Sequence, residues 1–249
     1  MKKNEWFPLM LEPPPGPRAA AATVAWGFFM LGIPSVTKLV LIFTGDVFAV
    51  RQGIEIAGSI VFALMMVLIY RDYLADSFMN VQMDPKKFIT TVAIACALMI
   101  AAAVVLTIVV GEEVLMVIPI KEFILWEWEA TLVTSSPVIS ILVLAVCAPV
   151  AISCMYYTVG FSLMCANSSK WAYVIVSAVL FAPYLFRVTF HGVMDFEWQT
   201  YLMRLPLYLV ACWAYQRTDS IWAPIVCHAV TNLLFCLFHL WNQTAGFFF

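Results

Sequence analysis

The sequence predicts an all-α membrane protein, a bundle of seven or eight transmembrane helices. Hydrophobic residues make up 64% of the 249 residues and charged residues only 11%, whereas soluble domains carry about 25% charged residues. Apolar runs of about 20 residues recur, which is the length that crosses a bilayer as a helix. The charged residues collect in short stretches between these runs, so no soluble domain is expected.

The first part of the chain is expected to hold three spans. Residues 1–18 are a polar, proline-rich entry in which Pro13–Pro15 disfavour a helix. The apolar run that follows is of full length, so no cleavable signal peptide is expected. The spans are predicted at residues 19–43, 53–70 and 88–110, and together they form an N-terminal unit, 19–110.

Residues 111–130 interrupt the apolar pattern. Acids and tryptophans together are typical of a segment that lies at the level of the lipid headgroups. The residues concerned are Glu112, Glu113, Lys121, Glu122, Trp126, Glu127, Trp128 and Glu129. The sequence therefore predicts an interfacial segment here.

The C-terminal part, residues 131–249, is expected to form the core of the bundle. Its first apolar run, 131–165, is longer than one span needs and has Pro149 in its middle. Either one kinked helix runs through the proline or two helices meet there. Further spans are predicted at 171–191, 200–215 and 221–240.

Charge restricts the class of partner and the orientation. The net charge is −2 and there is no basic stripe, which argues against nucleic acid. On a seven-span count most basic residues lie on one side, so the positive-inside rule puts the N-terminus in the cytoplasm. An eighth span would place Lys170 and Arg217 on the opposite side of the membrane. We expect an integral protein of the plasma membrane or another energy-transducing (inner) membrane, with lipids around it.

The last predicted span contains two polar residues one helical turn apart, His228 and Asn232, on the same face. Polar side chains in a membrane interior need a protein partner or a wet cavity, so they often mark function. The run Thr218-Asp219-Ser220-Ile221-Trp222-Ala223-Pro224-Ile225, followed by His228 and Asn232, resembles the third motif of the CPBP intramembrane proteases. That family includes the CAAX prenyl endopeptidases and the bacterial Abi proteins.

The resemblance implies roles for three residues. His228 corresponds to an active-site histidine and Asn232 to a residue of the oxyanion-stabilising site. The family's second motif, FxxxH, implies that His191 is the other histidine. The match is incomplete, because Arg187 occupies the position four before His191, although Phe186 and Phe190 are close by.

The first family motif, a proline-led EExxxR, is degenerate in this chain. Pro149 is retained, but Ile152 and Ser153 stand where the family has glutamates and Tyr157 where it has arginine. Hydrolysis by water needs a general base, and loss of one typically lowers the rate about 10²- to 10⁴-fold. The resemblance therefore implies the fold of a protease whose catalysis is impaired.

Other residues offer partial substitutes for the missing groups. Asp195 shares a face with His191 if the helix continues, and could orient the imidazole, although a polar loop is the favoured interpretation. Arg187 could bind a substrate carboxylate, or pair with Asp195 or Glu197. The pair Glu112–Glu113 is better explained as a solvated loop. His239 lies about 16 Å along the helix from His228, too far to share a small site.

Three functions remain open. The favoured one is a catalytically impaired CPBP-fold protein that binds a membrane protein or peptide as a scaffold or accessory subunit. The second is a divergent endopeptidase that uses His191, His228 and Asn232, with a divalent metal at His191 and His228 as one way to activate water. The third is haem binding or transport. In either of the first two, His191, His228 and Asn232 should line one polar cavity beside Ser153 and Tyr157.

Overall fold

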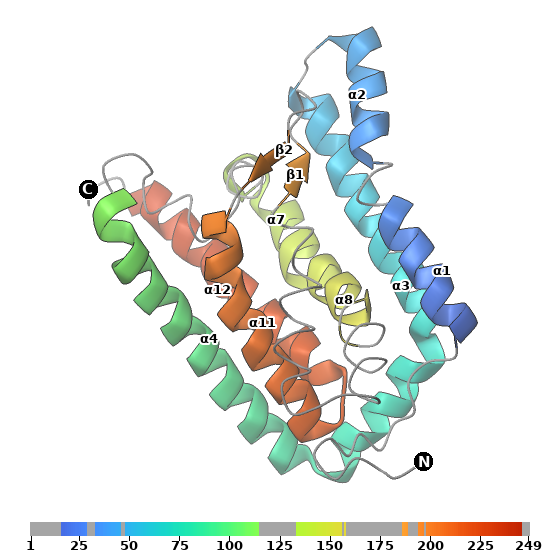
Figure 1. Cartoon of the computed structure of the whole chain (residues 1–249), viewed down its shortest axis with the longest axis vertical. Helices are drawn as coiled ribbons and strands as arrows, with labels where there is room; N and C mark the ends of the chain where they lie inside the picture. Colours follow the sequence, from blue (N-terminus) through green and yellow to red (C-terminus); the bar gives the residue numbers. More distant parts are fainter. Residues whose placement is uncertain are drawn as a thin grey trace.

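The computed structural model describes residues 16–28, 33–45, 48–114, 133–155, 157, 186–188, 194–196 and 198–245. These residues form a helical bundle with one short β-hairpin (Figure 1). The predicted all-α class is confirmed, and the hairpin is a small addition to it. The statements below concern this described part of the chain.

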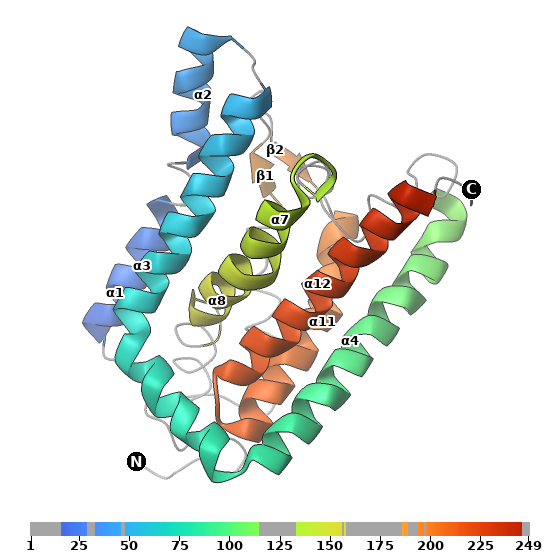
Figure 2. The same cartoon turned by 180° about the vertical axis from the view of Figure 1, so that it is seen from behind.

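Two long helices, α3 (Phe48–Met83) and α4 (Pro85–Val114), frame the bundle and meet at Asp84. Helices α1 (Gly16–Gly27) and α2 (Ile33–Thr44) pack along α3. Helices α11 (Trp198–Thr218) and α12 (Trp222–Ala245) pack against α4, as the view from behind shows (Figure 2). The candidate site described below includes residues of α12 and of a further segment that contacts both α3 and α12.

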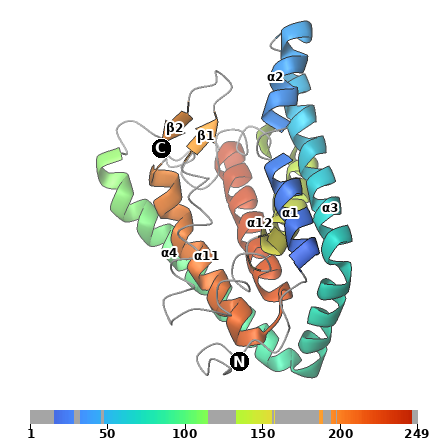
Figure 3. The ribbon, with the colours of Figure 1, turned by 45° about the vertical axis from the view of Figure 1, so that its right-hand side comes forward.

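A helical segment made of three parts lies between α3 and α12. Helix α7 (Pro137–Ser140) leads into a π-helix, η2 (Ile141–Cys147), and then into α8 (Ala148–Ser153). This segment contacts both helices, and in the turned view it is seen between α12 and α3, partly behind α1 (Figure 3). One helix therefore passes through Pro149, which decides between the two alternatives that the sequence left open at this proline.

The expected first span is divided into two helices. Helix α1 ends at Gly27 and α2 begins at Ile33, with Pro34 in its first turn. Proline suits the first turn of a helix because the N–H groups there have no intrahelical partner. The prediction of one unbroken span over 19–43 therefore missed a helix start at this proline; residues 29–32 lie outside the described part.

Helices α3 and α4 extend beyond their predicted bounds. With 36 residues, α3 is about 54 Å long, well over the roughly 30 Å of a hydrocarbon core. Its apolar part ends near Tyr70, and polar residues follow. Helix α4 runs to Val114, so Glu112 and Glu113 belong to its last turns instead of to a loop. The rest of the predicted interfacial segment lies outside the described residues.

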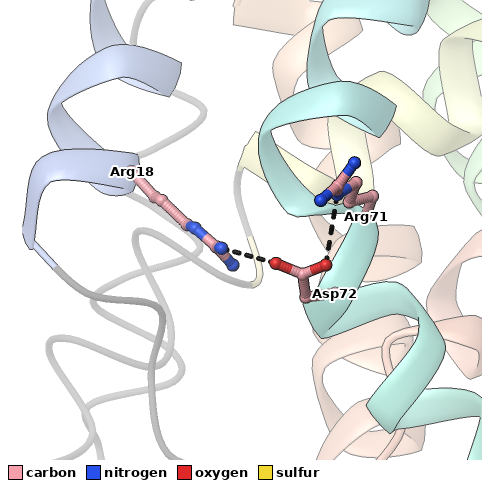
Figure 4. A network of polar contacts seen from close by, with 3 residues as sticks. All are labelled: Arg18, Arg71 and Asp72. Atoms are coloured by element: carbon pink, nitrogen blue, oxygen red, sulfur yellow. Dashed lines mark hydrogen bonds and ion pairs between the residues drawn. The ribbon is translucent and has the colours of Figure 1, made fainter.

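The polar end of α3 is linked to the start of α1 by an exposed ion pair. Asp72 lies 2.5 Å from the Arg18 guanidinium and 3.2 Å from Nε of Arg71 (Figure 4). Exposed pairs of this kind contribute little to stability. The contact nevertheless shows that Arg18 and Arg71 lie at the same end of the bundle.

Three described helices are long and apolar enough to cross a membrane: 52–83, 85–105 and 222–241. Two shorter apolar helices cover 35–44 and 137–153. Large apolar side chains such as Phe43 and Leu68 are more than 70% exposed, as expected for helix faces that contact lipid. The total of seven or eight spans stays a prediction.

A two-stranded antiparallel hairpin replaces the end of one predicted span. Strand β1 (Phe186–Val188) pairs with β2 (Met194–Phe196), with Arg187 opposite Asp195 in the register. The prediction of a helix over 171–191 is therefore wrong for residues 186–188. Asp195 stands in β2 and not on a helix face; His191 lies outside the described residues. The apolar pattern of 186–190 fits a short strand as well as a helix.

Candidate functional site around His228

Helix α12 begins with a turn that is fixed onto α3. Asp219 has a φ of 52°, a left-handed conformation that aspartate tolerates and that ends α11. The Ser220 hydroxyl then accepts a long hydrogen bond, 3.4 Å, from the Trp222 N–H, as a capping residue does. Pro224 stands in the first turn of α12, where its missing N–H costs nothing. This turn sets the direction in which His228 enters the bundle.

The contacts of this turn with α3 are buried hydrogen bonds. The Ile221 N–H donates to Ser77 Oγ at 2.8 Å, and the Ser220 hydroxyl donates to the Ser77 carbonyl at 2.9 Å. Asn80 Nδ2 donates to the Asp219 carbonyl at 2.7 Å. The Trp222 indole N–H donates to the Leu74 carbonyl at 2.8 Å. The serine and tryptophan of the family-like motif therefore dock α12 on α3.

His228 lies one and a half turns into α12 and is only 7% exposed. Its Nε2 forms a 2.9 Å hydrogen bond with the Tyr157 hydroxyl. The Tyr157 ring lies nearly parallel to the imidazole, with centroids 6.1 Å apart, and Tyr208 of α11 is closer still at 5.0 Å. The imidazole is thus enclosed by phenols from two neighbouring helices.

The residues at the degenerate first motif come from α8 and the turn after it. Ile152 is half-buried against the main core, and Ser153 is fully buried. Ser153 Oγ has no hydrogen-bond partner among the described residues. Tyr157 follows one turn later and makes the contact with His228. The position that has arginine in the family therefore does face His228, but with a neutral phenol.

Asn232 contacts the same helical segment at a different point. Its Nδ2 donates to the Leu144 carbonyl in η2 at 2.8 Å. Asn232 is half-buried, one turn beyond His228 on α12. His228 and Asn232 thus both contact the helix that carries Pro149, His228 through Tyr157 and Asn232 through the backbone of η2.

Several predicted site residues cannot be joined to this cluster. His191 lies outside the described residues, so its proximity to His228 stays a prediction. For Arg187 and Asp195 the structure gives strand register alone. His239 is buried, and its Nε2 lies 3.2 Å from Thr134 Oγ1, towards the other end of α12 from the Trp222 turn. Within the described part no three His, Cys, Asp or Glu side chains gather to hold a metal.

Sequence reasoning missed the phenols and the docking residues on α3. Tyr208 and Tyr215 belong to α11; Tyr215 lies 6.2 Å from Tyr157 between ring centroids, and its hydroxyl is hydrogen-bonded to that of Tyr73 on α3. Tyrosines are common in membrane helices, so no spacing in the sequence singles them out. Ser77 and Asn80, three residues apart and therefore on one helix face, were the detectable signal.

Comparison with known protein families gives a match for one segment of the chain. Residues 134–234 match the family model described as type II CAAX prenyl endopeptidase Rce1-like. The match covers less than half of the chain, and over this segment the chain is similar to the CAAX protease (CPBP) family. The match runs from the start of the η2-containing segment to just past Asn232, and so includes Pro149, Tyr157 and His228. No curated protein and no solved structure shows significant similarity to the chain.

The similarity to the CAAX protease family agrees with the apolar helices, and the protein is an integral membrane protein. The matched segment contains every residue that the motif resemblance singled out, His191 included. It also contains α11, whose tyrosines enclose His228. The family match supports the fold of this segment and the location of the candidate site within it. The chemistry of the site depends on which side chains this chain has there.

Proposed function

We propose that this CAAX-protease-like protein has an impaired hydrolytic site and acts as a membrane-bound binding or accessory subunit. The observation that carries the proposal is the 2.9 Å hydrogen bond between the Tyr157 hydroxyl and His228 Nε2. In the family the equivalent of Tyr157 is an arginine that organises the site. Here a phenol takes its place and engages the histidine directly.

The chemistry of the neighbouring positions supports this proposal. Water attack on an amide needs a base to take its proton and donors for the developing oxyanion. Ile152 cannot accept a proton, and the Ser153 hydroxyl stays protonated at neutral pH. Asn232 is the family's oxyanion residue, but its amide donates to a backbone carbonyl. The base is thus replaced by Ile152 and Ser153, and the oxyanion donor, Asn232, is engaged with a backbone carbonyl.

A binding role is compatible with the packed helical scaffold that the chain retains. The core around Tyr157 and Tyr215 is tightly buried, and the turn before α12 is fixed on α3 by several hydrogen bonds. A preserved scaffold with an altered site fits a protein that holds a membrane peptide, a lipid-modified protein or another subunit. The family match supports a ligand of the membrane-associated peptide class.

The decisive experiment is a cleavage assay with the full chain in proteoliposomes. The substrates are a prenylated peptide with a CAAX C-terminus and a peptide tethered by a transmembrane helix. We expect no cleavage above that of His228→Ala, the matched control. Cleavage by the unmodified chain that disappears in His228→Ala would instead establish the divergent endopeptidase and refute the impaired site.

Two further measurements complete the test. The triple variant Ile152→Glu/Ser153→Glu/Tyr157→Arg should gain cleavage if the rest of the site is intact. Purification from native membrane should yield a partner in constant ratio, and recovery of the chain alone would contradict the accessory role. Absorbance of the same sample near 400 nm tests for haem, and a Soret band would replace the proposal with haem binding.

A further inference from the structure

The π-helix η2 leaves one backbone carbonyl without its regular partner. In a π-helix each N–H donates to the carbonyl five residues earlier, and the Ala148 N–H does donate to the Val143 carbonyl. The next bond in this series would join residue 149 to the Leu144 carbonyl. Residue 149 is proline, which has no N–H. The Leu144 carbonyl therefore needs a donor from elsewhere.

Asn232 supplies that donor. Its Nδ2 lies 2.8 Å from the Leu144 oxygen, an ordinary hydrogen-bond length. Leu144 is only 2% exposed, so without Asn232 its carbonyl would be left unsatisfied in an apolar environment, which is costly. Pro149 of the first motif thus leaves the Leu144 carbonyl without a backbone donor, and Asn232 of the third motif supplies a side-chain donor in its place.

This arrangement also sets which side chains face His228. A π turn adds one residue to a helical turn, so every side chain that follows is rotated by about 100° relative to a regular α-helix. Tyr157 comes after this π turn and α8, in a further π-helical stretch that includes residues 154, 155 and 157, and its hydroxyl is hydrogen-bonded to His228. If the π turn relaxed to regular α-helix, the rotation would be lost and Tyr157 would move away from the imidazole.

We infer that Asn232 is a positioning residue that replaces the missing N–H of Pro149, stabilises the π turn and thereby aims Tyr157 at His228. Asn232 and His228 lie one turn apart on α12 and contact the same helix at two points. The first contact holds the backbone of η2 and the second receives the side chain that η2 directs. This assignment does not depend on whether the protein cleaves a peptide.

The test is a rescue experiment on the full chain in detergent or nanodiscs. Asn232→Leu keeps the number and branching of the side-chain heavy atoms but removes the donor, and should lower the midpoint of thermal unfolding by about 2 to 10 °C. Pro149→Ala restores an N–H at residue 149. In the double variant this N–H can donate to Leu144, or the helix can relax so that the Ala148 N–H does, and either change should restore most of the lost midpoint.

The control variant is Thr231→Val, which removes a neighbouring buried hydroxyl whose nearest acceptor is Met99 Sδ at 3.9 Å. Pro149→Ala should not rescue Thr231→Val. Equal rescue of both variants, or no rescue of Asn232→Leu, would overturn the inference. If Asn232→Leu does not accumulate, recovery of folded protein in the double variant is the rescue, and failure of both to accumulate also overturns it.

A second measurement separates positioning from simple stabilisation. In protein with ¹⁵N-labelled histidine, the Nε2 resonance of His228 reports its hydrogen bond with Tyr157. Asn232→Leu should shift this resonance in the same direction as Tyr157→Phe does, even below the unfolding temperature. An unchanged resonance in folded Asn232→Leu would show that Asn232 stabilises the helix without directing Tyr157.

Discussion

At the scale of single residues, the site shows how one substitution can change the role of its neighbours. The motif resemblance implies that His228 corresponds to a family histidine, and its Nε2 is hydrogen-bonded to a phenol. Two further rings, from Tyr208 and Tyr215, pack around the pair. The imidazole therefore belongs to a packed aromatic cluster that contributes to the stability of the bundle.

Replacing Tyr157 by phenylalanine tests this interpretation. Tyr157→Phe keeps the ring but removes the hydroxyl that is hydrogen-bonded to the buried His228 Nε2. We expect a loss of about 1 kcal/mol, between the roughly 0.6 kcal/mol average for membrane proteins and the 1–3 kcal/mol cost of a buried unsatisfied group. Thermal or denaturant unfolding in detergent measures it.

The control for this change is a double-mutant cycle with His228→Ala. Once His228 is absent, Tyr157→Phe should cost much less. Equal costs in both backgrounds would mean that the Tyr157 hydroxyl stabilises the protein through another contact and that the hydrogen bond to His228 contributes nothing.

At the scale of elements, the third motif has a structural task beside its histidine. Its serine and tryptophan join the start of α12 to α3 through Ser77 and Leu74. Pro224 and the capping Ser220 begin the helix at the correct place. The same motif therefore fixes where α12 starts and, through the helix period, where His228 points.

Removing the Ser77 hydroxyl should weaken this junction. Ser77→Ala leaves the buried Ile221 N–H without an acceptor, with an expected cost of about 1–3 kcal/mol in the free energy of unfolding. Asp76→Ala, one residue earlier and exposed, should change stability by less than about 0.5 kcal/mol. Comparable losses in the two variants would show that the hydrogen bonds of this turn do not stabilise the bundle.

Sequence reasoning located the long apolar helices, although it missed the helix start at Pro34 and predicted α3 and α4 too short. The last span was predicted from the run that contains His228, and α12 confirms it. The resemblance to the CAAX protease family, predicted from the same run, is supported by the match over residues 134–234. The strands at 186–188 and 194–196 were missed because each has only three residues, too few to show a periodicity. The enclosure of His228 depends on tertiary contacts between helices far apart in the chain, which no local spacing encodes.

At the scale of the whole molecule, the structure bears on the topology. Arg18 pairs with the polar end of α3, where Arg71 also lies. The turn between α11 and α12 docks on the same end through Asn80 and Ser77, which places Arg217 there too. Together with the single helix through Pro149, this favours the seven-span count, in which these arginines share one side of the membrane.

Cysteine accessibility tests this arrangement in the intact protein. Single cysteines at Arg71, Lys86 and Arg217 should react with a membrane-impermeant maleimide from one side only, and the positive-inside rule predicts the cytoplasmic side. A cysteine at Gly45, in the turn after α2, should react from the opposite side. The described native cysteines are buried or half-buried, so the unmodified chain serves as the background control. Labelling of positions 71 and 217 from opposite sides would contradict the shared end, because a residue within one helical turn of the α3 junction cannot lie across the bilayer from it.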